Sequence, residues 1–384
     1  MHTLTRPLYD PNPFKHEKTH GLLKLRFSKT SFELEHSVNH KHGSSFKNIP
    51  KMKAAVLNHS KQPLQLETRP DLNPSPGHVI VRLKNAALNR RDYWITQGLY
   101  PGIRTPVILG SDGAGTVAEI GEGVDSNWLT KEVIIQPGIH WGGDETAQSE
   151  AFHILGMPTD GTFATHVQIP VENLHTKPEN LNWAQSAALP LAGLTAYRAL
   201  FSQGGLTEGM NILITGAGGG VSAFALQFSL AAGANVWVTS SSASKIEKAI
   251  KLGAKGGANY KEENWSNTLA KQAGSFQLII DSAGGSGYHA LIELAAPSGR
   301  IVNYGATTGN PKNIDMFKVF WKQLRIQGTT MGSPQDFQNM IHLVESKNIQ
   351  PLIEKAFDLL EVNDALAMMR HSEQFGKIVL NCDC

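Results

Sequence analysis

The segment from Ile212 to Ser222 is the sequence feature that most limits how this chain can fold. An apolar run rich in β-branched residues leads into four glycines within five positions, and an apolar helical pattern over 221–231 begins at once. This order predicts a strand, a tight turn and the start of a helix. A second strand candidate, 235–239, follows Gly233 and completes a βαβ unit of about 30 residues.

A glycine turn in this position can bind a dinucleotide. Glycine lets the backbone approach a pyrophosphate closely, and the N–H groups of the first helical turn bind the anion. An ordinary glycine-containing loop is the alternative interpretation, because the pattern alone is not specific. Ser222 stands where the usual fingerprint ends in a glycine, and we expect this small residue to shift the helix only slightly. The turn residues expected to contact the cofactor are Gly218, Gly219, Gly220 and Val221.

The bulk composition argues against several classes of protein. The chain has 384 residues, enough for two or three domains, and its net charge of +2 supports neither nucleic-acid binding nor a membrane surface. No apolar run approaches the ~18 residues of a transmembrane helix. Its two cysteines, Cys382 and Cys384, cannot form a disulfide framework, so we expect a cytoplasmic protein in a reducing compartment. We interpret this tail as a frayed terminus with two idle thiols, although a C-x-C sequence can also bind metal or sense redox state.

The first 51 residues differ in character from the rest of the chain. They carry nine Lys and Arg against four Asp and Glu, with little periodic hydrophobicity. We expect 1–51 to be a poorly ordered extension and Met52 to be the functional start. A mitochondrial transit peptide would be nearly free of acidic residues, so mitochondrial targeting is the minor alternative to a cytoplasmic location.

Two kinds of patterning follow Met52. Residues 52–177 contain short strand candidates interrupted by Gly and Pro, which is typical of an antiparallel, barrel-like domain. From 178 to about 310, strands and helices alternate, which predicts an α/β fold with a parallel, doubly wound sheet. Strands are expected at 54–57, 79–83, 107–109, 115–120, 133–136, 165–169, 211–215, 235–239, 257–258, 278–281, 300–303, 325–329 and 377–380. Helices are expected at 89–97, 183–201 with breaks near Pro190 and Gly193, 245–251, 265–272, 288–294, 334–346 and 361–371.

Five short motifs occur in a fixed order along the chain after Met52. They are Pro76-Gly77-His78-Val79, Leu109-Gly110-Ser111-Asp112-Gly113-Ala114-Gly115, Gly121-Glu122-Gly123-Val124, Gly161-Thr162-Phe163-Ala164 and Leu194-Thr195-Ala196-Tyr197. With these motifs the chain resembles the medium-chain dehydrogenase/reductase superfamily. The resemblance implies a GroES-like β-barrel catalytic domain, 52–177 and 320–384, and an NADP-binding Rossmann domain with a doubly wound parallel sheet, 178–319.

Departures from the superfamily pattern point to a branch without metal. Zinc-dependent members carry a Cys where this chain has Asn89 and a His where it has Ser111, and zinc prefers thiolate, imidazole and carboxylate ligands. The loop 137–160, which holds structural zinc through four cysteines in other members, contains none. Its polar residues His140, Asp144 and His153 could in principle hold a metal, but we expect them to be surface residues. The resemblance is therefore to the zinc-free quinone oxidoreductase-like branch, and we expect no metal site.

The end of the second Rossmann strand indicates the cofactor. NAD enzymes place Asp or Glu there to bind the ribose hydroxyls, whereas this chain has Ser240 and Ser241, followed by Lys245. Hydroxyls and an ammonium fit a dianionic 2′-phosphate, so we predict NADPH. The alternative is a Ser-rich helix cap with a solvated lysine. The resemblance places Tyr260 beside the adenosine phosphate, although ordinary packing also accounts for an aromatic residue there.

The chemistry follows from the expected lack of zinc. Oxidising a simple alcohol without a Lewis acid is difficult, but an electron-poor C=C bond or a quinone accepts hydride more readily, and fixed donors stabilise the resulting oxyanion. We therefore predict an NADPH-dependent reductase of quinones or α,β-unsaturated carbonyls. Asn89 is the leading donor, with a helix N-cap as its alternative role, and Arg90 and Tyr93 are secondary donors. We interpret Arg91 and Asp92 as a surface ion pair, although the resemblance also matches Asp92 to a position of the superfamily.

Further cofactor contacts are expected at the nicotinamide half. The resemblance places Thr195 under the nicotinamide, although a threonine hydrogen-bonded within its own helix is the ordinary alternative. Loops at the carboxyl ends of the fifth and sixth strands should face the ligand, and Lys377 should close the site from the returning segment. The loop residues are Tyr304, Gly305, Ala306, Met331 and Gly332.

Partners and competing functions complete the interpretation. We expect a small-molecule substrate and a homodimer that pairs through the sheet edge at 325–329. Two other functions stay open: a zinc-dependent alcohol dehydrogenase with non-standard ligands, and a non-catalytic NADPH-binding protein.

Overall fold

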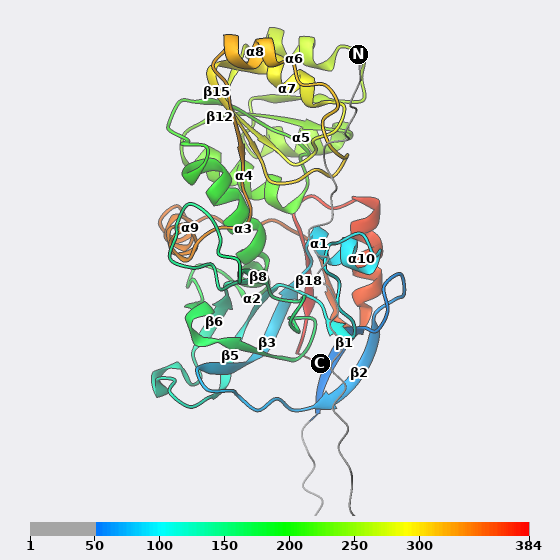
Figure 1. Cartoon of the computed structure of the whole chain (residues 1–384), viewed down its shortest axis with the longest axis vertical. Coiled ribbons are helices and arrows are strands. Elements are labelled where there is room, and N and C mark those ends of the chain that lie inside the picture. Colours follow the sequence, from blue (N-terminus) through cyan, green and yellow to red (C-terminus); the bar gives the residue numbers. More distant parts are fainter. Residues whose placement is uncertain (1–50, 384) are drawn as a thin grey trace, which may run out of the picture. The chain divides into compact units, whose positions relative to one another are not determined.

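The computed structural model describes residues 51–383 (Figure 1). The extension expected at 1–51 therefore lies outside the described residues, except for Lys51, which begins the first strand. Cys384 also lies outside them. Within 51–383, no helix combines the length and apolar character needed to cross a membrane.

The barrel domain is built from two main sheets and contains the GroES-like fold that the motifs imply. A seven-stranded sheet has the order β10-β6-β5-β3-β18-β17, with β9 also paired to β3, and a three-stranded sheet has the order β2-β1-β4. The barrel strands are β1 (Lys51–Leu57), β2 (Gln65–Pro70), β3 (His78–Ala87), β4 (Val107–Ile108), β5 (Asp112–Ile120), β6 (Glu132–Ile135), β9 (His166–Pro170), β10 (Leu174–Thr176), β17 (Ile353–Asp358) and β18 (Lys377–Asn381). A short pair, β7 (Gly138–Ile139) and β8 (His153–Ile154), lies in the 137–160 loop. The pairs in these sheets are antiparallel except β17 with β18, which run parallel.

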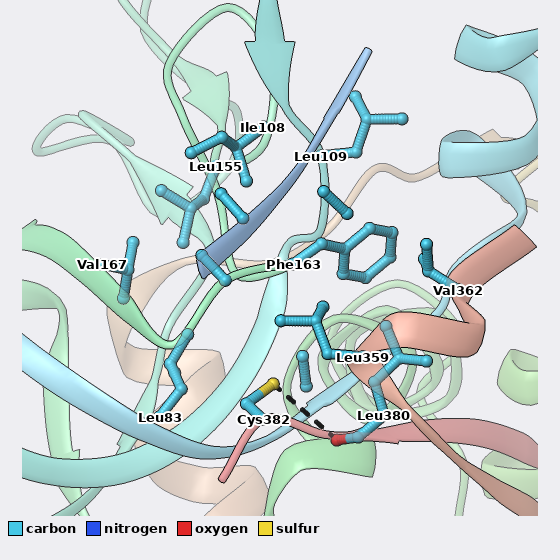
Figure 2. Close-up of a cluster of buried hydrophobic side chains, with 14 of the residues drawn as sticks. Leu83, Ile108, Leu109, Leu155, Phe163, Val167, Leu359, Val362, Leu380 and Cys382 are labelled. Atoms are coloured by element: carbon cyan, nitrogen blue, oxygen red, sulfur yellow. Dashed lines mark hydrogen bonds between the residues drawn. The ribbon is translucent and has the colours of Figure 1, made fainter. Parts of the chain in front are cut away.

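The last strand carries the chain back into the barrel. In Figure 1 the red β18 lies beside the blue β3, and Val379 is opposite Ala87 in their antiparallel register. This pairing places Cys382 in the barrel core, where it is 1% exposed. Figure 2 shows its Sγ directed at the Leu380 carbonyl, among side chains that include Phe163. The expectation of a frayed end was therefore wrong for Cys382, because the strand before it is held in the sheet.

The second domain contains the predicted doubly wound sheet. Its six strands are all parallel in the order β13-β12-β11-β14-β15-β16, which is the classical dinucleotide-binding order. They are β11 (Asn211–Ile214), β12 (Asn235–Ser240), β13 (Gly256–Asn259), β14 (Phe276–Asp281), β15 (Ala295–Asn303) and β16 (Arg325–Gly328). Because β16 pairs with β15, the sheet extends past the domain boundary that the sequence placed at residue 319.

Helices cover both faces of this sheet because successive strand residues point to opposite sides. Ile212 and Ile214 pack in the same core cluster as Phe224 of α4, whereas Leu213 packs with Leu291 of α7. Figure 1 shows α6, α7 and α8 gathered together beyond the sheet. The helices are α1 (Arg90–Thr96), α2 (Trp183–Ala188), α3 (Pro190–Tyr197), α4 (Gly220–Ala231), α5 (Ala243–Lys251), α6 (Trp265–Ala273), α7 (Tyr288–Leu294), α8 (Met316–Trp321), α9 (Pro334–Ser346) and α10 (Val362–His371).

The helical segment expected at 183–201 is interrupted before Pro190, as predicted, but not at Gly193. Helix α2 ends at Ala188 and α3 begins at Pro190, whose fixed φ suits the first helical position. Gly193 lies inside α3 without interrupting it, which corrects the second expected break. A Cβ added at Gly193 would lie 2.9 Å from the sulfur of Met340 on α9. Glycine here permits close packing of two helices.

Candidate active site

The glycine turn lies where β11 meets α4, as predicted. Gly218 has a φ of +103°, Gly219 is the N-cap, and Gly220 is the first residue of α4. The Ser222 hydroxyl donates to the Gly216 carbonyl at 2.8 Å, so the residue that replaces the usual glycine closes the turn on itself. The N-terminus of α4 therefore presents backbone N–H groups suited to a pyrophosphate, with Val221 in its first turn.

A buried polar cluster lies against this turn. Asp112, at the start of β5, accepts hydrogen bonds on Oδ2 from Lys377 Nζ at 2.8 Å and from Asn89 Nδ2 at 2.9 Å. Its Oδ1 accepts from the Leu191 backbone N–H at 2.8 Å. The stem of Lys377 reaches α4, where a Cβ added at Gly220 would lie 3.0 Å from its Cδ. The Asp112 carboxylate at the start of β5 therefore connects β18 and α3 with Asn89, the residue before α1.

The side chain of Asn89 is held from both ends. Lys377 Nζ donates to Asn89 Oδ1 at 2.7 Å, and Asn89 Nδ2 donates to Asp112. Because an ammonium only donates and a carboxylate only accepts, the orientation of the amide is chemically fixed. The second Nδ2–H has no hydrogen-bond partner within residues 51–383. Asn89 is also the N-cap residue of α1, the alternative role considered for it, and its backbone N–H donates to Asp92 Oδ2 at 2.7 Å.

Arg91 and Asp92 are buried, which corrects the expectation of a surface ion pair. Arg91 Nη1 donates to the Ser111 hydroxyl at 2.8 Å and to the Leu155 carbonyl at 3.0 Å, so it fixes the loop beside the site. Burial raises the pKa of Asp92 to about 6, against the opposing effects of Arg91 and of the Asn89 N–H. The sequence did not indicate this burial, because both residues are charged and adjacent in a short helix.

Arg90 and Lys245 converge on Ser372 at the end of α10. Arg90 Nη2 donates to the Ser372 hydroxyl at 3.0 Å, and Lys245 Nζ donates to its carbonyl at 2.6 Å. The Lys245 ammonium also lies over the glycine turn, 3.1 Å from a Cβ built on Gly218. Burial lowers the pKa of Lys245 below its ordinary value. Neither cation forms an ion pair with a carboxylate of the described chain, so both can contact an anion. Tyr93, the other predicted secondary donor, lies with its ring beneath the Arg90 guanidinium.

The end of β12 carries hydroxyls, as the sequence shows. Ser240 is buried and its backbone carbonyl accepts from the Tyr260 N–H at 3.1 Å, which places these two predicted residues together. The Ser240 hydroxyl accepts from the Ser242 N–H at 3.3 Å, whereas the neighbouring Ser241 is exposed. The ring of Tyr260 is half-exposed and therefore accessible to a ligand.

The predicted nicotinamide contacts fall into two groups. Thr195 Oγ1 donates to the Leu191 carbonyl within α3, which is the ordinary role considered for it. Gly332 lies against Leu194, the neighbour of Thr195 in α3, and Met331 adopts a φ of +45°. The loop after β16 therefore contacts α3. In the loop after β15, Tyr304 N–H donates to the Asp281 carbonyl, and the next residues, Gly305 and Ala306, are exposed.

Asp281, at the end of β14, organises these loops and was missed by the sequence analysis. Its carboxylate accepts from Thr215 Oγ1 at 2.8 Å, from Asn303 Nδ2 at 2.9 Å and from the Gly284 N–H at 2.9 Å. It therefore ties together the carboxyl ends of β11, β14 and β15. An acidic residue directly after the apolar run 278–280, and before Ser-Ala-Gly-Gly, was the available signal.

The donor set at Asn89, Ser111 and Asp112 does not fit zinc. An amide and a hydroxyl are poor zinc ligands, and the one carboxylate already binds the Lys377 ammonium. Within residues 51–383, no group of three or more His, Cys, Asp or Glu is arranged to hold a metal ion. In the 137–160 loop the rings of His140 and His153 lie 5.6 Å apart, while the Asp144 carboxylate accepts from Thr146.

Comparisons with known proteins agree with this architecture. Residues 75–179 match the alcohol dehydrogenase GroES-like domain family, and residues 220–346 match the zinc-binding dehydrogenase family. The zinc-type alcohol dehydrogenase-like protein YogA of Leptosphaeria maculans is 35% identical over 83% of this chain and 94% of its own length. An acryloyl-coenzyme A reductase of Sulfurisphaera tokodaii is 30% identical over 86% of this chain and 99% of its own length. A crystal structure of an NAD-dependent alcohol dehydrogenase superimposes with a TM-score of 0.80 at 32% identity, covering 86% of this chain and 99% of that one.

Proposed function

Because this chain belongs to the medium-chain dehydrogenase/reductase superfamily of oxidoreductases, we propose that it is an NADPH-dependent reductase of quinones or α,β-unsaturated carbonyls that acts without zinc. One observation carries the proposal. The position that would hold a catalytic metal is built from Asn89, Ser111 and an Asp112 already bound to an ammonium, directly beside the glycine turn. These side chains offer hydrogen-bond donors to a substrate, but they do not form a set of ligands suited to a Lewis-acidic metal ion.

The residues of the site fit a phosphorylated nicotinamide cofactor. The N-terminus of α4 receives the pyrophosphate, and the loops after β15 and β16 receive the nicotinamide. Lys245 and Arg90 supply positive charge beside the turn, and the end of β12 offers Ser240 and Ser241 where an NAD enzyme has a carboxylate. When bound, NADPH supplies the hydride that reduces the acceptor.

The protein's own contribution to the reaction is to stabilise charge on oxygen. Hydride addition to the β-carbon of an enone moves the π electrons onto the carbonyl oxygen, and a proton from solvent then completes the reduction at the α-carbon. The remaining N–H of Asn89 can donate to that oxygen, because its amide is clamped by Lys377 and Asp112. A donor fixed in advance needs no rearrangement as the charge develops.

The relatives narrow the acceptors that are worth testing. The protein from Sulfurisphaera tokodaii is described as an acryloyl-coenzyme A reductase, and an acryloyl thioester is itself an α,β-unsaturated carbonyl compound. We therefore place acryloyl-coenzyme A in the same panel as small quinones and cyclic enones.

The deciding experiment is an NADPH oxidation assay on the purified full chain. Benzoquinone, cyclohexenone and acryloyl-coenzyme A serve as acceptors, and a secondary alcohol with NADP⁺ tests the reverse class of reaction. Turnover with at least one acceptor, without bound zinc, supports the proposal. Zinc that is stoichiometric and required for alcohol oxidation would establish the zinc-dependent alternative. Tight NADPH binding without turnover of any acceptor would instead indicate a non-catalytic binding protein.

We also propose that a second copy of the chain covers the exposed surface of α8 and β16. All four residues of β16 are exposed and the strand ends the order of the sheet, so it can pair with another β16. Helix α8 adds Phe320 and Trp321, which are 62% and 72% exposed. A large exposed apolar surface beside an open strand edge favours self-association. Light scattering on the wild-type protein should give twice the mass of one chain. The substitution Trp321→Lys should lower the measured mass to that of one chain. A monomeric wild-type protein would contradict the proposed dimer.

A further inference from the structure

A cavity of about 320 Å³ lies in the barrel domain. All of the residues that line it fall between 52 and 170, and neither the glycine turn nor Asn89, Asp112 or Lys377 is among them. Its volume is within the range of about 300–1,000 Å³ that small-molecule sites occupy. The proposed reductase function makes no use of this cavity.

The floor of the cavity is apolar. Ile108, Leu155 and Val167 line it and are at most 2% exposed, because they belong to the barrel core. Figure 2 shows these three side chains on the same side of the core cluster. A cavity of about 150 Å³ with such a lining holds one benzene ring. The floor therefore suits an apolar body of about two rings.

The rings of His140 and His153 form part of the wall. Their centroids are 5.6 Å apart, and both residues line the cavity. The backbone of His140 is fixed, because the Ser149 hydroxyl donates to its carbonyl at 2.7 Å. Aromatic ligands gain from offset or edge-to-face contacts with other rings. This wall therefore favours an aromatic body over an aliphatic one.

The polar groups of the cavity are mainly hydrogen-bond acceptors. Nδ1 of His78 and Nδ1 of His153 lie 2.9 and 3.2 Å from backbone carbonyls of their own loops. A carbonyl only accepts, so each Nδ1 carries the proton and each neutral ring keeps Nε2 as an acceptor. Asp160 Oδ1 accepts from the Ile108 N–H at 2.9 Å, while its Oδ2 has no hydrogen-bond partner within residues 51–383. A ligand here must supply donors.

These acceptors argue against ions as ligands. Within the described part of the chain, no group of three or more His, Cys, Asp or Glu could hold a metal ion. An organic anion would be repelled by the Asp160 carboxylate, which lines the same cavity. A plain hydrocarbon would cover the acceptors without supplying donors to them. A neutral aromatic molecule with hydroxyl groups satisfies both the floor and the acceptors.

The cavity and the candidate active site lie next to the same loop residue. Leu155 lines the cavity, and its backbone carbonyl accepts from Arg91 Nη1 at 3.0 Å and from the Ser111 hydroxyl at 2.8 Å. Arg91 and Ser111 do not line the cavity themselves. A ligand in the cavity therefore leaves the residues assigned to the cofactor uncovered.

We propose that this cavity is a second binding site, for a hydroxylated aromatic molecule of about two rings. The rings lie on the apolar floor against His140 and His153. The hydroxyl groups donate to Asp160 Oδ2 and to a histidine Nε2. The site goes beyond the proposed reductase function and does not depend on it.

The test is calorimetric titration of the full-length protein with 2,7-dihydroxynaphthalene at pH 8, where an imidazole is ordinarily neutral. This diphenol is not a hydride acceptor, so turnover does not interfere. We expect one equivalent to bind with a Kd of about 1 mM or tighter, and equally well with and without saturating NADPH. The matched compound 2,7-dimethoxynaphthalene has the same rings but no donors, and should bind at least about tenfold more weakly.

Two variants locate the bound diphenol. Thr159 is exposed and lines the cavity, so Thr159→Trp should fill the entrance and abolish binding. Thr207→Trp, at an exposed position outside the cavity, should leave the Kd unchanged. Asp160→Asn keeps an oxygen for the Ile108 N–H and should weaken diphenol binding about tenfold. Glu150→Gln, which removes an exposed carboxylate outside the cavity lining, is its control.

Three outcomes would overturn the inference. A wild-type protein that does not bind the diphenol lacks the site. Equal affinities for the dihydroxy and dimethoxy compounds would show that the acceptors do not recognise hydroxyl groups. Binding that survives in Thr159→Trp, or that NADPH displaces, would place the diphenol elsewhere. Asp160→Asn keeps the proposal testable if Thr159→Trp does not fold. Because none of these measurements requires turnover, failure of the proposed reductase function is recognised separately.

Discussion

The Lys245 ammonium on α5 donates a 2.6 Å hydrogen bond to the backbone carbonyl of Ser372 at the end of α10. The nucleotide-binding domain and the returning segment of the barrel domain are therefore joined directly over the glycine turn. Arg90 reaches the hydroxyl of the same serine. Ser372 adopts a φ of +53°, which turns the chain sharply after α10 and presents both of its oxygens to the two cations.

Replacing Lys245 by alanine should weaken NADPH binding far more than NADH binding. A charge-assisted contact to phosphate contributes roughly 1.5–3 kcal/mol, so we expect the Kd for NADPH to rise at least about tenfold. Titration of wild type and variant with both cofactors measures the effect, with Lys251→Ala as the exposed control on the same helix. Equal losses for NADPH and NADH would reject the assignment of Lys245 to the 2′-phosphate.

Gly218→Ala should abolish cofactor binding at the turn. The φ of +103° disfavours any side chain, and the new Cβ would lie 2.8 Å from Cδ of Lys245. Gly209→Ala is a matched control, because Gly209 also has a positive φ, +80°, but has no atom within 4 Å of an added Cβ. We expect the control to cost about 1 kcal/mol of stability and to leave the Kd for NADPH unchanged. Similar affinities in the two variants would show that the turn does not contact the cofactor.

The elements that the sequence predicted well have strong local signals. The βαβ unit at the glycine turn and helix α9, Pro334–Ser346, were both placed within a residue or two. Ser333 precedes helix α9 as its N-cap and forms a capping box with Asp336, and Pro334 occupies the first helical position. These signals depend only on residues near one another in the chain.

The missed elements depend on distant partners. Strand β17, Ile353–Asp358, is mostly exposed and carries little alternation, so only its pairing with β18 makes it a strand. The centre of the site also depends on residues that are far apart in the sequence. Asp112 and Lys377 are 265 positions apart, and neither stands in a motif that indicates the other. Sequence reasoning found Asn89 and Lys377 separately but could not place an ammonium beside the amide.

Stability should fall as the pH rises through the titration of Asp92. Its pKa is about 6 in the folded protein against 3.8 for an ordinary aspartic acid, so the folded state binds more protons between these values. By linkage, the free energy of unfolding decreases by up to about 3 kcal/mol from below pH 4 to above pH 6. Asp92→Asn should remove this slope, whereas the exposed Asp364→Asn should keep it. Urea unfolding at a series of pH values measures it; the same slope in Asp92→Asn and wild type would contradict the assignment.

Removing Arg198 from its buried ion pair with Asp336 should destabilise the fold strongly, because the pair is the centre of a wider hydrogen-bond network. Asp336 also accepts from the Ser202 hydroxyl and from the N–H of Ser333, while Arg198 Nη2 donates to two backbone carbonyls of the 137–160 loop. Removing the guanidinium leaves a carboxylate buried without its cation, a change that typically costs about 3–5 kcal/mol. Arg198→Met should therefore lower the free energy of unfolding by about that amount, measured by urea denaturation. Arg104→Met, at an exposed position, should change it by less than about 0.5 kcal/mol. A loss for Arg198→Met no larger than for Arg104→Met would mean that the loop and α9 are held by their apolar contacts alone.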